Sequence, residues 1–419
     1  MNNTSRRDFL KMSTATAAAL GLGLVACKRQ EKFELKTLPD GERIRVGVIG
    51  IGARGKAILS ALEYVPDFKV VAICDTLDFQ MEAAKKYLAS DTATYHDYND
   101  LLAHKGLEAV IISTPLHEHY RMVLSALDAN LHILCEKALA HNIEQCKTIK
   151  LRAEKSDKLF QISYQYQLNP VFNAIKNIVD NGYCGKITRI EATWDRNGDW
   201  RRKLPSPDLE RQLNWRMYKE YSGGLMAELA SHQLNMIDNL LGSHPTKVVG
   251  TGGIDYWKDG RETFDNVHAL FDYPGGVKVG FHSGTTNKYE GYQIKFYGDK
   301  ATIVSYNMEK AYIYPEAKQT DEEWKDNVDS VTGASIKIIG KENKREIKVQ
   351  KSNDIVYPTD NNYFNVTWHL YHNLAAAIKG EEPLLLGLKD GYQSAISVHL
   401  ANEAIRHERV VRWLPEYDV

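Results

Sequence analysis

The sequence predicts an α/β protein of two parts: a doubly wound parallel sheet, then an α+β domain built on a large, mostly antiparallel open sheet. Between residues 43 and about 140, short apolar strand-like segments alternate with helical segments, which is typical of a parallel sheet with helices on both faces. Beyond residue 155, apolar and polar residues alternate in several successive segments with few helices between them. That period is typical of an antiparallel sheet with one covered face.

The first part opens with a strand–loop–helix–strand unit. An apolar run leads into Gly50-Ile51-Gly52-Ala53-Arg54-Gly55, which fits G-x-G-x-x-G, and a helix follows over 56–63. Glycine permits the sharp turn and a close approach to a pyrophosphate, whose charge meets the N–H groups that begin the helix. A second buried strand, 68–75, ends at Asp75, where a carboxylate would hydrogen-bond the adenosine ribose.

This unit predicts a Rossmann domain over 43–160 that binds a dinucleotide through the loop residues Gly50, Ile51, Gly52, Ala53 and Arg54 and through Asp75. Asp75 would repel a 2′-phosphate, which favours NAD over NADP. The alternative interpretation is a structural strand–turn–helix in another kind of α/β domain. The rest of this part is predicted as helices at 79–89, from Asp97, and through 124–129, with strands at 109–115 and 132–137.

The second part, 161–419, is predicted to be a substrate and oligomerisation domain. Its expected strands lie at 186–194, 247–253, 266–273, 276–283, 293–297 and 301–306. One helix, 225–241, interrupts them and ends at Gly242, and two helices, 363–379 and 388–407, close the chain. Residues 316–360 are rich in charge and are predicted to form a solvated insertion.

The first 27 residues are predicted to be a targeting signal, followed by a linker over 28–42. The run Ser5-Arg6-Arg7-Asp8-Phe9-Leu10-Lys11 resembles a twin-arginine export signal, and Leu24-Val25-Ala26-Cys27 resembles a lipoprotein box with Cys27 lipidated. The alternative, an ordinary signal peptide cut nearby, also yields an exported protein. We therefore expect a periplasmic lipoprotein, held to the membrane by this lipid only, that carries NAD out tightly bound.

Composition excludes several classes of protein. Lys and Arg number 53 against 54 Asp and Glu, so no basic excess favours a nucleic-acid partner. After residue 27 no apolar run is long enough to cross a membrane. The remaining cysteines form no Cys/His cluster, so neither a metal site nor a disulfide is predicted; they are Cys74, Cys135, Cys146 and Cys184.

Three further clusters carry chemistry. Cys135-Glu136-Lys137 and Ser113-Thr-Pro-Leu-His-Glu-His119 each follow a strand, where open α/β sheets bind ligands. Ser222-Gly-Gly-Leu-Met-Ala-Glu-Leu-Ala-Ser-His232 opens the helix of the second part. With the glycine loop, their order and spacing resemble the glucose–fructose oxidoreductase / inositol dehydrogenase / MocA family over residues 43–415. The resemblance implies the two-domain fold, bound NAD, a sugar substrate, and a homo-oligomer, either a dimer or a tetramer.

The resemblance implies three catalytic residues. In that family a Glu-Lys-Pro motif places the lysine beside the nicotinamide; here the lysine is Lys137, and Ala138 replaces the proline. An ammonium there can stabilise a forming alkoxide, and a desolvated lysine can act as a base. His232 is the expected acceptor of the hydroxyl proton, and Glu228, four residues earlier on the same face of a regular helix, is expected to orient it or to contact the sugar.

The same resemblance implies the other ligand contacts. Thr114, Pro115, His119 and Glu136 match positions near the cofactor, and Gln165 is expected to touch cofactor or substrate. Tyr166 is either a wall of the site or part of the core. The stretches 195–202 and 214–218 are rich in the aromatic and guanidinium groups that bind sugars, and they supply the candidates Arg196, Trp200, Arg201 and Tyr218. An ordinary solvated loop is the alternative for both stretches.

Three functions fit these observations. The first is an exported NAD-dependent oxidoreductase acting on a secondary hydroxyl of a sugar or glycoside, with C3 of a hexose as the attractive position. The second is an NAD-dependent glycosidase, similar to the α-N-acetylgalactosaminidases of the superfamily, which oxidises transiently, eliminates the aglycone, adds water and reduces again. The third is a lipid-anchored sugar-binding protein that retains the fold without turnover.

Overall fold

The computed structural model describes residues 38–316, 334–339, 344–349 and 362–419. The export signal, Cys27 and most of the expected linker lie outside these residues, as does most of 316–360. No helix among the described residues is both long and apolar enough to cross a membrane. The four described cysteines are buried and unpaired, in agreement with the sequence.

The first sheet is parallel and has the strand order β3-β2-β1-β4-β5-β6. The order reverses between β1 and β4, and this is where doubly wound sheets bind ligands, beyond the carboxyl ends of the strands. The strands are β1 (Ile44–Ile49), β2 (Phe68–Cys74), β3 (Ala93–Tyr95), β4 (Ala109–Ile112), β5 (His132–Cys135) and β6 (Phe160–Ile162). β6, which contains the expected boundary at residue 160, belongs to this sheet.

Helices cover both faces of this sheet and follow the expected segments. The Asp97 side chain caps α4, accepting a hydrogen bond from the Asn99 N–H at 2.8 Å, as its sequence position predicts. The expected helix at 79–89 is shorter and ends in a 3-10 turn. The helices of this part are α2 (Ala53–Leu62), α3 (Asp78–Ala84), α4 (Tyr98–Leu102), α5 (His119–Asp128) and α6 (Ile143–Ala153).

Ten strands form the second sheet, in the order β14-β15-β13-β12-β11-β7-β10-β9-β8-β16. All its pairs are antiparallel except β7 with β10, so the expected fold class is confirmed. Its strands are β7 (Ile187–Trp194), β8 (Lys247–Gly253), β9 (Asn266–Asp272), β10 (Lys278–Gly284), β11 (Tyr292–Gly298), β12 (Ala301–Tyr306), β13 (Lys310–Pro315), β14 (Ala334–Ile339), β15 (Lys344–Val349) and β16 (Val411–Arg412).

The expectation of a solvated insertion over 316–360 is wrong for its described parts. β14 and β15 pair with each other, and β15 pairs with β13, so this stretch extends the sheet. The alternation of isoleucine with lysine and glutamate in these strands suits a sheet with one wet face. The high charge of the whole stretch concealed that short-range alternation.

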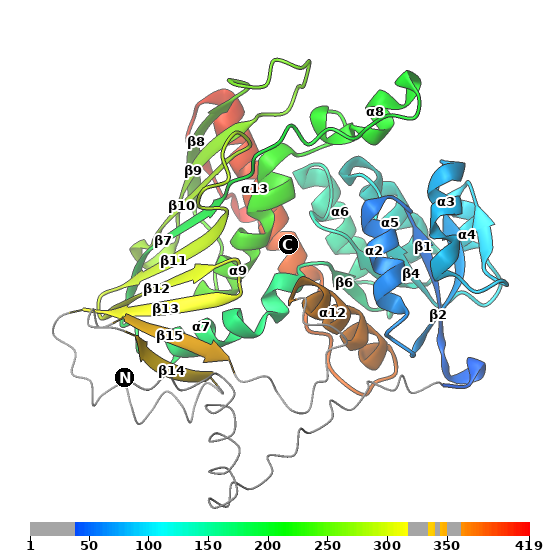
Figure 1. The fold of residues 1–419 in the computed structure, drawn as a ribbon, viewed down its shortest axis with the longest axis horizontal. Helices are drawn as coiled ribbons and strands as arrows, with labels where there is room; N and C mark the ends of the chain where they lie inside the picture. Colours follow the sequence, from blue (N-terminus) through cyan, green and yellow to red (C-terminus); the bar gives the residue numbers. More distant parts are fainter. Residues whose placement is uncertain (1–37, 317–333, 340–343, 350–361) are drawn as a thin grey trace, which may run out of the picture. The chain divides into compact units, whose positions relative to one another are not determined.

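One face of the second sheet is covered by helices. Figure 1 shows α9 (Ser231–Leu241) and α13 (Leu388–His407) behind β8, β9 and β10, and α13 packs on β8. Along β9 the residues toward these helices are buried, while Leu270 on the other face is 61% exposed. The sheet therefore has one buried face and one open face. Also helical are α7 (Pro170–Asp180), α8 (Glu210–Leu213) and α12 (Asn362–Ile378).

The helix expected over 225–241 is not uniform. A π-helical segment, Met226–Ala230, precedes α9, and Gly242 ends the helix with a φ of 62°. A π segment has more residues per turn than an α-helix, so the spacing of its side chains differs from that of α9. Glu228 lies inside the segment and His232 beyond it, so the two residues do not share one regular α-helix.

Asp238 is a carboxyl group enclosed between α9, α13 and the second sheet. Its Oδ1 accepts a hydrogen bond from the Tyr273 hydroxyl at 2.6 Å, and its Oδ2 accepts one from Ser394 at 3.4 Å. Burial raises the pKa of Asp238 to about 8, with the two hydrogen bonds opposing the rise. Between about pH 4 and pH 8 the folded chain therefore holds a proton that the unfolded chain has lost.

The contribution of Asp238 to the free energy of unfolding should fall as the pH rises from about 4 to about 8, by up to about 1.4 kcal/mol per pH unit. Asp238→Asn removes the titration and keeps an acceptor for Tyr273. The quantity to measure by calorimetry is the melting temperature of the variant minus that of the wild type. We expect this difference to be larger at pH 8.5 than at pH 6. Asp180→Asn, on the exposed surface of α7, is the matched control and should show no such trend. A constant difference for Asp238→Asn would contradict the assignment.

Candidate active site

The glycine loop between β1 and α2 admits only glycine at two positions. Gly50 has a φ of +88°, and a Cβ there would meet the Ser113 backbone at 2.8 Å. A Cβ on Gly55 would lie 2.0 Å from the Gly50 oxygen. Gly52, the N-cap of α2, instead faces open space, and this leaves room for a group at the helix N-terminus. The loop thus fits a pyrophosphate as the sequence predicts.

Asp75 follows β2 and turns toward this loop. Its Oδ2 accepts a hydrogen bond from the Ile51 N–H at 2.7 Å, and its Oδ1 accepts one from the Leu77 N–H at 2.9 Å. Burial raises the pKa of Asp75, and the backbone hydrogen bonds oppose the rise. The carboxylate keeps free lone pairs on the side of the cavity, where ribose hydroxyls can donate to it.

A cavity of about 1020 Å³ extends from this loop to the second domain. Both domains contribute to its wall, which is large enough for a dinucleotide and the reacting part of a substrate. Of the predicted site residues, it is lined by Gly50, Gly52, Ala53, Arg54, Asp75, Thr114, Pro115, His119, Glu136, Lys137, Gln165, Glu228 and His232. Ile51 is fully buried behind the loop and contributes its N–H to Asp75.

Arg54 and Glu136 join the glycine loop to the end of β5. The Arg54 Nε lies 2.6 Å from the Glu136 Oε1, which also accepts a hydrogen bond from Ser163 at 2.9 Å. Ser163 follows β6, so three chain segments meet at one carboxylate oxygen. Gln165 is buried beside them and accepts a long hydrogen bond from Ser163 at 3.4 Å. This network fixes the residue that immediately precedes Lys137.

His119 lines the cavity, and its ring nitrogens face two backbone carbonyls. It is 1% exposed, and its Nδ1 lies 2.9 Å from the Ala138 carbonyl and its Nε2 3.1 Å from the Thr114 carbonyl. Both ring nitrogens are therefore occupied by backbone, and burial lowers the pKa of the ring. His119 ties the loop after β4 to the residue that follows Lys137, so it positions the site.

Lys137 is half-buried in the wall of the cavity. Its Nζ donates a hydrogen bond to the Glu228 carbonyl oxygen at 3.1 Å, and the Lys137–Ala138 peptide is cis. Burial lowers the pKa of the amine, against the opposing charges of Glu228 and Glu136. The amine can therefore exchange a proton more readily than a surface lysine.

His232 is 6% exposed and is enclosed by aromatic rings. Its ring centroid lies 5.0 Å from that of Tyr166, 5.7 Å from Trp194 and 5.9 Å from Tyr164. Burial, together with the charges of Lys137 and Arg54, lowers the pKa of His232 well below its usual value. The imidazole is neutral at pH 7 and can accept a proton.

The expected contact between Glu228 and His232 is absent. The Nδ1 of His232 is buried with no hydrogen-bond partner in the described chain, and the Glu228 Oε2 instead accepts from the Arg216 Nε at 2.7 Å. The Glu228 carboxylate is thus bound by Arg216 and not by the imidazole. Although burial alone would raise the pKa of Glu228, the charges of Arg216 and Lys137 lower it.

Arg216 is a site residue that sequence reasoning missed. Its guanidinium lines the cavity and neutralises a carboxylate whose side chain is only 9% exposed. It lies in the stretch 214–218, which is rich in groups that bind sugars. Nothing local in the sequence distinguishes it from the neighbouring arginines. Only the folded chain shows which arginine meets Glu228.

The predicted sugar-binding residues divide into two groups. Tyr166 and Arg196 line a second cavity of about 650 Å³, together with Trp194, and the Tyr166 and Trp194 rings separate this cavity from His232. The Arg196 guanidinium lies 5.1 Å from the Trp200 ring. The second cavity also contains amide and charged groups that were not predicted: Asn169, Asn197, Lys288, Asn307 and Glu309.

Arg201 and Tyr218 line neither of the two cavities, and their polar atoms bind other side chains. The Arg201 Nε pairs with Asp259 at 3.0 Å, and its Nη1 pairs with Glu210. The Tyr218 hydroxyl donates to Glu210 at 2.9 Å, and the ring is 9% exposed. These contacts hold the stretches 195–202 and 214–218 against the segment before β9, and they use the polar atoms of both side chains.

Comparison with known families agrees with this geometry. The oxidoreductase-family profile GFO_IDH_MocA, an NAD-binding Rossmann fold, matches residues 44–164, and the GFO/IDH/MocA C-terminal domain matches 172–304. The chain belongs to the GFO/IDH/MocA family. Both of its domains follow the family order, and the predicted NAD-binding Rossmann fold is confirmed. A twin-arginine translocation signal matches residues 3–23, which points to export.

Relatives in this family include enzymes of several kinds. The chain is 28% identical to an uncharacterized oxidoreductase YrbE of Bacillus subtilis over 50% of its length and 58% of YrbE. It is 27% identical to glycosyl hydrolase family 109 protein 2 of Shewanella sp., over 54% of its length and 53% of that protein. The alignments thus span little more than half of these relatives. The structure is also similar to that of a levoglucosan dehydrogenase in complex with NADH and levoglucosan, with a TM-score of 0.72 and 19% sequence identity. The superposition covers 88% of this chain and 99% of that chain.

The position of Asp75 predicts the cofactor preference. Asp75→Asn removes the charge that repels a 2′-phosphate and weakens the hydrogen bonds to the ribose, since charge-assisted bonds are roughly twice as strong. We expect about tenfold weaker NAD binding and a higher proportion of NADP, measured by assaying the nucleotide released from natively purified protein on denaturation. Thr76→Val, which changes the neighbouring hydroxyl that accepts from Gln212, is the control. An unchanged ratio in Asp75→Asn would place the ribose elsewhere.

Proposed function

We propose that this protein is an exported NAD-dependent oxidoreductase that oxidises a secondary hydroxyl of a sugar or glycoside. The observation that carries the proposal is the meeting of Lys137 and His232, from different domains, in one cavity with the glycine loop. Family membership and the export signal support it. When bound, NAD supplies the acceptor for the hydride.

Lys137 and His232 have complementary tasks in this proposal. Neutral His232 accepts the proton of the substrate hydroxyl, and its low pKa keeps it available as a base across the physiological range. Lys137 is held by the Glu228 carbonyl, so its remaining N–H groups can orient the same oxygen and stabilise its developing charge. Glu228 and Arg216 balance the charge around the amine and position it.

The substrate class follows from the two cavities. The aromatic rings of Tyr166 and Trp194 can stack on the apolar C–H faces of a sugar, while Arg196 and the amides of the second cavity can bind hydroxyls. A second cavity beside His232 gives space for a further ring, which favours a glycoside over a free monosaccharide. We place the oxidised hydroxyl at C3 of a hexose, which would give a 3-keto sugar.

The proposal includes the cellular setting. Twin-arginine export carries folded proteins, so NAD held in the large cavity would leave the cytoplasm with the chain and be retained. We further propose lipid attachment at Cys27, which would place the protein at the periplasmic side of a membrane, and assembly as a dimer or tetramer.

A redox-neutral glycosidase is the second candidate, favoured by the similarity to a family 109 glycosyl hydrolase. In that reaction the NAD is reduced and re-oxidised within one cycle, which suits a compartment without a cofactor pool. The presence of both Lys137 and His232 favours net oxidation, and a binding protein without turnover would leave both side chains without a use.

The deciding experiment uses protein purified natively from its exporting host. Released nicotinamide is assayed after denaturation, and the intact protein is incubated with a panel of glycosides with and without an electron acceptor. A product lighter by two hydrogen atoms, with the ketone located by NMR, is the expected result. Free monosaccharide without added oxidant would favour the glycosidase, and no product of either kind would support the binding protein.

Replacement of the two reacting side chains should separate chemistry from binding. Lys137→Met and His232→Asn are each expected to lower kcat by about 10²–10⁴-fold, the usual contribution of a positioned acid or base. Bound NAD, measured after denaturation, should stay near wild-type content. Lys176→Met, a surface substitution on α7, is the matched control. Full activity in both site variants would exclude the proposed roles.

A further inference from the structure

The open face of the second sheet carries a row of polar side chains. The strand register aligns Thr251, His268, His282, Thr193 and Gln293 across β8, β9, β10, β7 and β11. All five line one shallow hollow of about 630 Å³. This face lies opposite to the helices that cover the sheet, and the hollow is separate from the two cavities beside His232. The proposed oxidoreductase makes no use of these groups.

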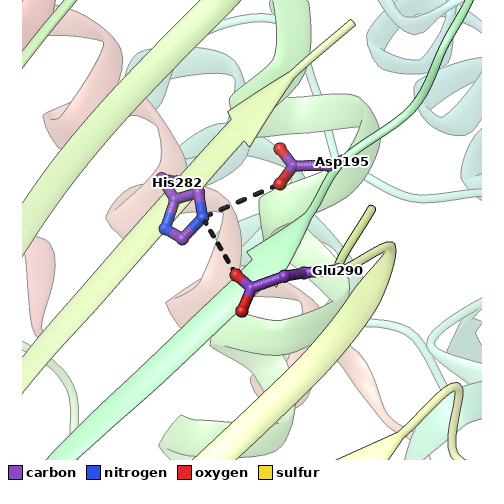
Figure 2. Close-up of side chains that lie close together, drawn as sticks. All are labelled: Asp195, His282 and Glu290. Carbon is purple, nitrogen blue, oxygen red and sulfur yellow. Dashed lines mark ion pairs between the residues drawn. The ribbon is translucent and has the colours of Figure 1, made fainter. Parts of the chain in front are cut away.

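Three side chains with metal-binding atoms converge at His282, the middle member of this row (Figure 2). Asp195 directly follows β7, His282 lies in β10 and Glu290 precedes β11. The His282 Nε2 lies 3.8 Å from the Asp195 Oδ2 and 3.9 Å from the Glu290 Oε2. The three ligand atoms all lie within 4.8 Å of one another.

These distances differ from those of a direct hydrogen-bonded pair. An imidazole that bonds a carboxylate directly approaches it to about 2.7–3.2 Å. Two ligands on one metal ion, with bonds of about 2.0–2.2 Å, lie about 3–4.3 Å apart, depending on the coordination angle. The separations from His282 to both carboxylates fall in the second range. The cluster therefore has the spacing of ligands around a shared ion.

The outer oxygen of each carboxylate is held by the protein. The Gly284 N–H donates to the Asp195 Oδ1 at 2.8 Å, and the Lys295 Nζ lies 3.9 Å from the Glu290 Oε1. The other two oxygens, Oδ2 and Oε2, face His282, and the Asp195 Oδ2 also accepts a hydrogen bond from the Thr193 hydroxyl at 3.2 Å. Such outer contacts orient ligands in metal sites. Two carboxylates face one lysine here, and a cation would offset the negative charge that remains on them.

An independent observation points to a ligand in the same hollow. Gln293 is 5% exposed, and its Oε1 is buried with no hydrogen-bond partner in the described part of the chain. A buried amide oxygen without a partner is costly. A water molecule held by an ion in the hollow would satisfy it, since metal ions with few protein ligands retain water.

We propose that Asp195, His282 and Glu290 bind one divalent first-row transition-metal ion, of the zinc or manganese type. An imidazole nitrogen with two carboxylate oxygens suits such ions, whereas Mg²⁺ and Ca²⁺ prefer oxygen alone. The ion would join the end of β7 to β10 and to the segment before β11. That segment also supplies Lys288 and Gly291 to the second cavity, so the ion would fix one wall of it.

The test is a titration of the whole purified protein after removal of metal with a chelator. Zn²⁺, Mn²⁺ and Mg²⁺ are titrated separately by calorimetry, and metal retained after gel filtration is counted by mass spectrometry. We expect one Zn²⁺ or Mn²⁺ per chain and much weaker Mg²⁺ binding. Glu290→Gln, which preserves size, and His282→Ala should each weaken Zn²⁺ binding by at least about tenfold. Zn²⁺ should raise the melting temperature of the wild type and not of these variants.

His407→Ala provides the matched control. His407 lies 3.5 Å from Glu403 on the surface of α13, so it tests binding at an ordinary histidine–carboxylate pair. Affinity and stoichiometry should be unchanged in this variant. The proposal is overturned if the wild type binds no stoichiometric ion, if Glu290→Gln binds as tightly as the wild type, or if His407→Ala loses as much affinity. Should His282→Ala fail to fold, Glu290→Gln alone decides.

Discussion

The contact on which the site depends is the hydrogen bond from the Lys137 amine to the Glu228 carbonyl, because it joins a strand end of the first sheet to the π segment beside the second. An amine in this position loses solvation, and the negative charges of Glu228 and Glu136 partly offset that loss, while Arg216 pairs with the Glu228 carboxylate. Removal of one of these buried charges would leave its partner buried and unpaired. That loss lowers the free energy of unfolding by more than the intact ion pair contributes to it. The network therefore joins the two domains beside the cavity that Lys137 and His232 line.

Much of the fold and the cofactor site could be predicted because their signals are local. The turn at Gly50 requires a positive φ, the helix that follows begins at the loop, and Asp75 ends the next strand; each of these is a short-range property. Lys137 and His232 were found through motifs at strand and helix ends. Their common cavity then follows from the topology, since parallel strands end at one edge of the sheet.

The features that could not be predicted depend on contacts between distant parts of the chain. Nothing near His119 indicates that both its nitrogens meet backbone carbonyls, and nothing near Arg201 indicates that Asp259 and Glu210 bind it. The pairing of Arg216 with Glu228 joins two separate segments, and nothing near either residue indicates it. The strands in 334–349 were concealed by charge, although their alternation suits a sheet.

The π segment has a consequence for how this site can change over time. A π turn is an α-helix that contains one additional residue while both of its ends keep their packing. Loss of a single residue between 226 and 230 would restore a regular helix whose two ends keep their orientation, so only the side chains inside the segment would change place. Insertion and deletion, more than substitution, are then the changes that can exchange the partner of Lys137 while the second sheet and its covering helices stay as they are.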